Sequence, residues 1–127
     1  MGELNNQINR AVWFDIPVSD LDRAIQFYKA VLAIDVFKES FEKFTFAVLD
    51  HKDGNGGCLV IKPDEISDAG LLLYLNAEGR IRDAVLKTTS NGGKVLEDVT
   101  SIGPHGFRAV ILDSEGNRLA LHSNVDA

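Results

Sequence analysis

The sequence predicts one α+β domain that repeats the unit strand-helix-strand-strand-strand twice along its 127 residues. Two observations predict this class. An apolar strand runs directly into an amphipathic helix at two places about sixty residues apart, and three short strand-like segments follow each helix. A linker over 63–70, rich in Asp and Ser, divides repeat one (about 9–62) from repeat two (about 71–124) within the single domain 1–127.

The first repeat begins with a strand over 12–18, in which polar and apolar side chains alternate around Asp15. Ser19 is placed to cap the following helix, with Asp22 as the returning half of a capping box. Apolar residues at helical spacing then continue to Leu32 along one face. A polar turn over 50–57 separates the last two of three expected strands, 36–40, 43–49 and 58–62.

The second repeat follows the same order. Residues 71–76 form an apolar strand, and residues 80–90 form a helix that ends at the left-handed stop 91–93, Asn-Gly-Gly. Three more strands are expected over 94–100, 107–112 and 118–122. One helix cannot easily cover both faces of a four-stranded sheet, so the uncovered face of each sheet must meet something else.

Composition and charge narrow the classes of protein. A formal net charge of -6 and a pI near 4.9 argue against nucleic-acid binding. Each apolar stretch is far shorter than the ~20 residues of a spanning helix, which argues against a membrane protein. The polar start Met1–Gln7 lacks the features of a signal peptide, so we expect a cytoplasmic location. The single cysteine, Cys58, excludes an internal disulfide.

Two segments carry a resemblance to a known family. The strand-to-helix segment Trp13–Tyr28 and the closing hairpin Gly106–His122 resemble the opening and closing motifs of the vicinal-oxygen-chelate superfamily. That superfamily includes glyoxalase I, bleomycin-resistance proteins and extradiol dioxygenases. The resemblance implies curved mixed sheets around a cleft that is built within one chain or between two. It also implies a homodimer.

Metal-dependent members of this superfamily hold their cation with ligands on the first and last strands of each half. The resemblance places these four positions at Trp13, Val60, Leu72 and Ala120. None of these side chains offers a lone pair that a hard or borderline cation would accept. We therefore expect a subgroup member without the family metal, and we expect no other cofactor.

The residues two positions further along these strands should point the same way, because strand side chains alternate. They are Asp15, Lys62, Tyr74 and His122, and we expect them on one level beside the apolar positions. His122 is a candidate general acid or base that Asp15 could orient, while Lys62 and Tyr74 could bind a polar ligand group. The alternative is structural: a hydrogen-bonded His122, a solvated Lys62, a buried Tyr74 and a surface Asp15.

Three further residues are less informative. Arg108 interrupts an apolar strand and is either a rim residue that reaches water or an anion anchor at the mouth of the cleft. His51 lies in the polar turn, where we do not expect it to join the site. Cys58 is expected to be a small buried hydrophobic residue.

These features predict a metal-independent protein, similar to bleomycin-resistance proteins, that binds a small, mostly apolar or aromatic molecule in its cleft. The alternative is a glyoxalase-like lyase, isomerase or dioxygenase. Such an enzyme would use either a metal held by non-family ligands or His122 as an acid-base group. A third alternative is a regulatory subunit whose exposed sheet faces a partner chain.

Overall fold

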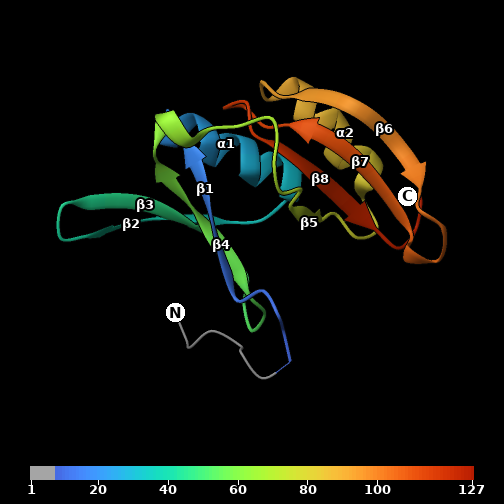
Figure 1. The fold of residues 1–127 in the computed structure, drawn as a ribbon, viewed down its shortest axis with the longest axis horizontal. Helices are drawn as coiled ribbons and strands as arrows, with labels where there is room; N and C mark the ends of the chain where they lie inside the picture. The colour runs from blue at the N-terminus through green and yellow to red at the C-terminus, as the bar shows by residue number, and fades with distance from the viewer. Residues whose placement is uncertain (1–7) are drawn as a thin grey trace.

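The computed structural model describes residues 8–127 and contains two four-stranded mixed sheets and two α-helices (Figure 1). Sheet one and its helix comprise β1 (Trp13–Val18), α1 (Leu21–Leu32), β2 (Val36–Phe41), β3 (Phe44–Leu49) and β4 (Gly56–Ile61). Sheet two and its helix comprise β5 (Tyr74–Asn76), α2 (Ile81–Ser90), β6 (Lys94–Ser101), β7 (Phe107–Leu112) and β8 (Arg118–Ser123). The predicted α+β fold of two βαβββ units is confirmed. The segment 1–7, which carried the signal-peptide argument, lies outside the described residues.

The two sheets have the same topology. Their strand orders are β1-β4-β3-β2 and β5-β8-β7-β6. In each sheet the first and last strands of the repeat pair in parallel, and the remaining neighbours are antiparallel. A parallel pair needs a long crossover, which α1 and the strands after it provide in repeat one.

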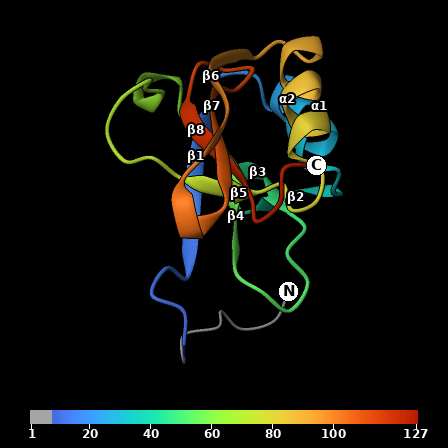
Figure 2. The ribbon, with the colours of Figure 1, turned by 90° about the vertical axis from the view of Figure 1, so that its right-hand side faces the viewer.

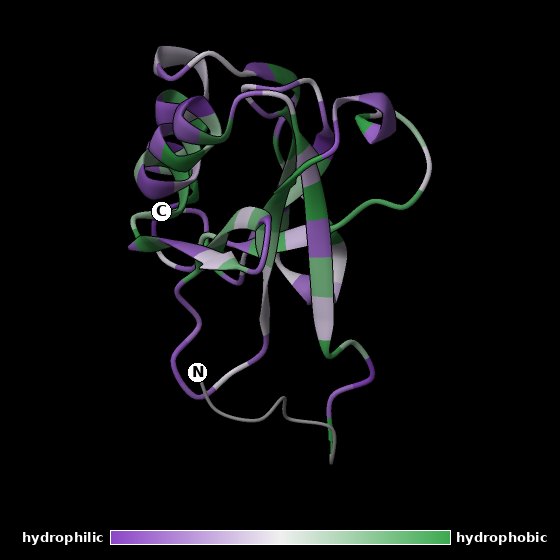
Figure 3. Cartoon of the chain, turned by 90° about the vertical axis from the view of Figure 1, so that its left-hand side faces the viewer, coloured by the Kyte–Doolittle hydropathy of each residue, from purple (hydrophilic) through white to green (hydrophobic). Residues whose placement is uncertain are grey.

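Both helices lie side by side on the same side of the two sheets (Figure 2). A single hydrophobic core lies between them and the sheets, and it includes Val18, Phe27, Leu59, Ile81 and Ile111. The residues of β1 alternate between this core and the opposite face, which Figure 3 shows as alternating bands along the strand that follows the N-terminal trace. We call the face of each sheet that α1 and α2 do not cover its open face.

The start of α1 differs from the sequence prediction. Asp20, not Ser19, is the N-cap, and its side chain accepts a hydrogen bond from the backbone N–H of Arg23 at 3.0 Å. Ser19 instead donates its hydroxyl to Glu115 at 3.0 Å. The predicted capping box of Ser19 and Asp22 is therefore wrong, because a carboxylate from the other repeat binds the amides before the helix.

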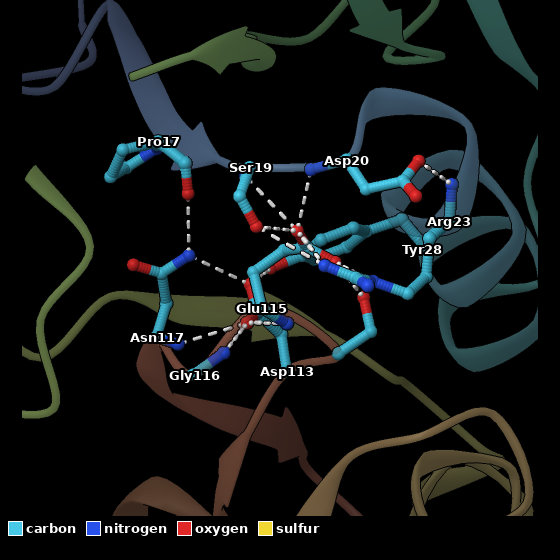
Figure 4. Close-up of polar contacts among 10 residues, drawn as sticks. Pro17, Ser19, Asp20, Arg23, Tyr28, Asp113, Glu115, Gly116 and Asn117 are labelled. Carbon is cyan, nitrogen blue, oxygen red and sulfur yellow. Dashed lines mark hydrogen bonds and ion pairs between the residues drawn. The ribbon is translucent and has the colours of Figure 1, made fainter. Parts of the chain in front are cut away.

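Glu115 belongs to the turn between β7 and β8, and it fastens repeat two to the N-terminus of α1 (Figure 4). Its Oε1 accepts from the backbone N–H groups of Ser19 and Asp20, and Arg23 donates to both carboxylate oxygens at 2.8 Å. Burial opposes ionisation of this carboxyl. The hydrogen bonds from Arg23, Asp20 and the adjacent serines outweigh that effect and lower the pKa of Glu115 to about 2.

Asp113 holds the same turn together from inside. Its Oδ1 accepts from the backbone N–H groups of residues 115–117, each at 2.9 Å. Its Oδ2 accepts from the buried Tyr28 hydroxyl at 2.5 Å and from the Asn117 amide at 3.0 Å. Burial, followed by the charge of Asp113, raises the pKa of Tyr28 well above its usual value. The Asn117 amide also donates to the Pro17 carbonyl, so the turn contacts both β1 and α1 (Figure 4).

The start of β5, next to the linker, also differs from the sequence prediction. β5 begins at Tyr74 rather than at residue 71, so Leu72 precedes the strand. Arg118 explains this shift: its backbone N–H donates to the Ser67 carbonyl, and its Nη2 donates to the Gly70 carbonyl. These bonds hold the linker against the start of β8. Neither α-helix of the described region is long and apolar enough to cross a bilayer.

Candidate functional site

The open face of sheet one is lined with aromatic side chains. The register aligns Asp15, Cys58, Val48 and Phe37 across the four strands, so these residues share one face. Alternation along each strand then adds the other members. We call the aromatic set on this face the aromatic face; its members are Trp13, Phe37, Phe41, Phe44 and Phe46.

Much of this aromatic surface is exposed in the single chain. The exposed fractions of Phe41 and Phe44 are 65% and 68%. A cavity of about 490 Å³ lies on this part of the sheet, and Phe44, Phe46, Val60 and Lys62 contribute to its lining. Exposed aromatic side chains gathered around a cavity are typical of a binding surface.

Two polar contacts mark the edge of the aromatic face near β1. The Cys58 thiol donates to Asp15 at 3.2 Å, and burial together with this bond raises the pKa of Cys58 to about 11. Cys58 is buried, as expected, and its thiol stays protonated at neutral pH. The ring of His51 meets Trp13 edge to face with centroids 5.5 Å apart, so the expectation that His51 stays away from the site is wrong. Its turn folds back beside β1.

The linker borders a second, open cavity between the repeats. It has a volume of about 440 Å³ and is lined by Asp15 and Pro17 of β1, Leu72 and Leu73 of the linker, and Arg118 of β8. Leu72 therefore lies at a cavity, although it is not part of β5. A third cavity of about 590 Å³ is lined by residues of both repeats, including His51 and Tyr74.

The open face of sheet two is polar. Tyr74 pairs with Ala120, Ala120 with Val110, and His122 with Arg108 across the strands, which puts all five side chains on one face. Arg108 donates from Nη1 to the Tyr74 hydroxyl at 2.6 Å, and its Nε lies 3.5 Å from Oε1 of Glu97. The rings of Tyr74 and His122 have centroids 6.4 Å apart. We call Tyr74, Glu97, Arg108 and His122 the polar face.

His122 is hydrogen-bonded through one ring nitrogen. Its Nε2 lies 2.7 Å from the His105 carbonyl oxygen, which can only accept, so Nε2 carries the proton. Nδ1 is then the basic nitrogen of the neutral ring. Asp15, the expected orienting carboxylate, instead binds Cys58 on the other sheet. Within residues 8–127, Asp15 therefore does not orient His122 in the way the sequence suggested.

The prediction that Asp15, Lys62, Tyr74 and His122 lie on one level is wrong. Asp15 pairs with Cys58, whereas Lys62 lies four residues further along and beyond the end of β4. Lys62 forms an ion pair with Glu65 at 3.8 Å, which agrees with a solvated strand end. Internal repetition shows which residues correspond, but it does not fix the register of two parallel strands joined by a long crossover.

The residues at the family's ligand positions do not fit a divalent cation. Trp13 pairs with Gly56 and Val60 with Pro17, and none of these four residues has a side-chain atom that would bind such a cation. No group of three His, Cys, Asp or Glu side chains in the described part of the chain is close enough to hold a metal ion. Independence from a metal stays a prediction.

The aromatic face is absent from the sequence-based predictions. The alternation of Phe37 with Phe41, and of Phe44 with Phe46, is a period-two signal that could have placed these side chains on one face. Glu97 was missed because a bulge in β6 shifts the register on either side of it.

Comparison with known proteins connects this geometry to a family. Residues 7–121 match the family model described as Glyoxalase/Bleomycin resistance protein/Dioxygenase superfamily. A glyoxylase-like domain-containing protein of Didymella fabae is 32% identical over 120 residues, which cover 84% of this chain and 88% of that protein.

Solved structures share the fold at lower identity. TnmS3, an antibiotic binding protein from Streptomyces sp. CB03234, superposes with a TM-score of 0.69 at 21% identity, over 92% of this chain and 97% of its own. Glyoxalase I from Zea mays superposes with a TM-score of 0.65 at 21% identity, over 88% of this chain but 45% of its own. The same architecture therefore occurs in a binding protein and in an enzyme, and the side chains of the site must distinguish the two.

Proposed function

This chain belongs to the Glyoxalase/Bleomycin resistance protein/Dioxygenase superfamily, and within it we propose a metal-independent protein that binds a small, mostly apolar or aromatic molecule. The observation that carries this proposal is the aromatic face. It gathers Trp13 and four of the seven phenylalanines of the chain on a sheet surface that neither helix covers. Aromatic ligands gain both burial of apolar area and favourable ring geometry from such a surface.

Metal independence is supported by the residues at the ligand positions. Trp13, Val60, Leu72 and Ala120 have no donor atoms for a cation, and Trp13 adds a flat apolar surface where a metal-dependent relative would hold a ligand. The similarity to an antibiotic binding protein agrees with a binding role but shows the fold alone. The ligand-binding residues that we propose are the eight predicted positions and the phenylalanines of the aromatic face.

We also propose a homodimer that completes the site. None of the hydrogen bonds and ring contacts described above joins a residue of the aromatic face to one of the polar face. A second copy could place its polar face opposite the aromatic face and so cover Phe41 and Phe44. The cytoplasmic location stays a prediction from the sequence.

The enzymatic alternative has less support. His122 retains a basic nitrogen, but among the described residues Asp15 binds Cys58 and not His122, and Cys58 is held as a thiol. A general base needs a geometry that sets its proton affinity and direction. We therefore favour binding over catalysis.

Tryptophan fluorescence tests the proposal, because Trp13 is the only tryptophan in the chain. Titration with a panel of polycyclic aromatic compounds, such as a naphthol, a coumarin and an anthraquinone, should quench or shift its emission saturably. Phe46→Ala should weaken that response, since Phe46 shares the face with Trp13. Leu86→Ala is the matched control, because Leu86 is an exposed apolar residue on α2. Emission that no compound changes would contradict the proposal.

A further inference from the structure

We propose that the polar face binds an anionic oxygen group of the ligand, a carboxylate or an ionised phenol, with Arg108 as the counter-charge and Tyr74 as a second donor. This inference rests on the proposed function, because it assigns the polar end of a molecule whose apolar part lies on the aromatic face. Of the two interpretations of Arg108, a rim residue that reaches water or an anion anchor, this proposal adopts the anchor.

Arg108 is held over the sheet and is only partly exposed to water. It lies near the start of β7, opposite His122 on one side and Thr100 on the other. Its side chain is 28% exposed, although an arginine on a strand can usually reach solvent with its whole head group. The hydrogen bond from Nη1 to the Tyr74 hydroxyl fixes the guanidinium above β8.

Most N–H donors of this guanidinium have no hydrogen-bond partner among the described residues. The group carries five N–H bonds in a planar fork. Among the described residues it makes a single hydrogen bond, to Tyr74, and its Nε is buried without one. Glu97 provides opposite charge at 3.5 Å, beyond good hydrogen-bond length. The remaining donors match the two oxygens of a planar anion.

Tyr74 supplies the second donor. Its oxygen already accepts from Arg108, so its own proton remains to be donated. The ring is 43% exposed and stands within 6.4 Å of His122, measured between ring centroids. His122 points its Nε2 proton at the His105 carbonyl, so that proton does not compete with Arg108 and Tyr74 for the ligand oxygen.

Glu97 acts as a weak internal substitute for the ligand anion. A ligand carboxylate with two well-aligned hydrogen bonds should displace it, because charge-assisted bidentate bonds are stronger than an ion pair without a hydrogen bond. This competition gives a distinctive expectation. Removal of the Glu97 charge should strengthen anion binding, whereas a merely structural pair would not produce a gain in affinity.

The test compares the naphthoate anion with its uncharged amide by isothermal titration calorimetry on the full chain. Wild-type protein should bind naphthoate about tenfold or more tightly than naphthamide, the ratio expected for one charge-assisted contact. Arg108→Gln should abolish that preference and leave naphthamide affinity within about twofold. Glu97→Gln should raise naphthoate affinity alone. Arg82→Gln is the control, because it removes the same charge from a surface pair with Asp126.

The failures are distinguishable. Equal binding of both probes by wild type, or a preference that Arg108→Gln does not change, would overturn the anion anchor and leave the aromatic site intact. A naphthoate affinity that falls or stays constant in Glu97→Gln would also overturn it. Absence of binding by both probes would overturn the proposed function and this inference with it.

Discussion

The two repeats share one backbone plan, but their open faces have opposite chemistry. Sheet one presents Trp13 and four phenylalanines, whereas sheet two presents Tyr74, Glu97, Arg108 and His122. Topology and strand order are the same in both. The same backbone plan therefore carries an aromatic face in one repeat and a polar face in the other, and the side chains alone make the difference.

The turns before the last strands of the repeats also differ. In repeat two the turn 113–117 is tied by Asp113 and Glu115 to Tyr28 and the start of α1. In repeat one the equivalent Asp50 accepts one long bond, from the Lys52 backbone N–H at 3.4 Å. The turn of repeat two therefore joins the halves. The turn of repeat one instead places the His51 ring against Trp13.

The largest expected effect is a difference in stability between variants of Asp113 and Asp50. Asp113→Ala should lower the free energy of unfolding by about 3 kcal/mol. The substitution leaves a buried tyrosine hydroxyl and three backbone N–H groups without their hydrogen-bond acceptor. Asp50→Ala should cost less than about 0.5 kcal/mol. Urea denaturation of both variants measures the two values. Similar losses in the two variants would show that the turns are equivalent.

Burial of the Cys58 thiol on the open face of sheet one should make this cysteine unreactive. With a pKa of about 11, this thiol should react with iodoacetamide about a hundredfold more slowly at pH 8 than an ordinary exposed cysteine. Asp15→Asn should accelerate the reaction, since the carboxylate that favours the thiol is lost. A wild-type rate equal to that of a free thiol would contradict this description.

Glu115 gives the tie between the repeats a pH dependence. Its folded-state pKa of about 2 lies below the usual value of 4.5, so its stabilisation is complete above pH 4.5 and is lost as pH falls toward 2. Glu115→Gln should cost about 2 kcal/mol at neutral pH, and roughly half or more of this difference should vanish by pH 3. Denaturation at both pH values is the measurement. A constant difference would mean that charge is not the cause.

A smaller effect is expected on self-association, which tests whether the aromatic face lies in the proposed dimer interface. Phe44→Glu should weaken self-association about tenfold or more, because it buries a charge against apolar area in the interface. Leu86→Glu on α2 should have no effect, although Leu86 is just as exposed. Sedimentation velocity over a concentration series compares the variants. Equal behaviour of the two would place the interface elsewhere.

Local patterns in the sequence predicted most of the fold. β7 has the predicted bounds, and the other strands and helices begin and end within three residues of those expected, because hydrophobic period and turn residues are local signals. The cap of α1 was wrong for the opposite reason. Ser19 looks like a cap beside its own helix, but its partner Glu115 lies 96 positions away in the chain.

Strand alternation predicted which candidate residues share a face, but not how those residues are arranged on it. Trp13, Asp15 and Val60 share an open face, as do Tyr74, Ala120 and His122, which strand alternation alone indicates. Which residues lie opposite one another on neighbouring strands depends on the register of the parallel pair, and no local sequence pattern encodes that register. Leu72 illustrates a further limit, since Arg118 holds the linker and shortens β5 through long-range backbone contacts.

Calorimetric titration of chelator-treated protein with naphthoate tests the central claim, that the aromatic face binds its ligand without a metal. We predict saturable binding whose affinity stays the same when Zn²⁺, Ni²⁺ or Mn²⁺ is restored. Binding that appears only after a divalent ion is returned would contradict the account.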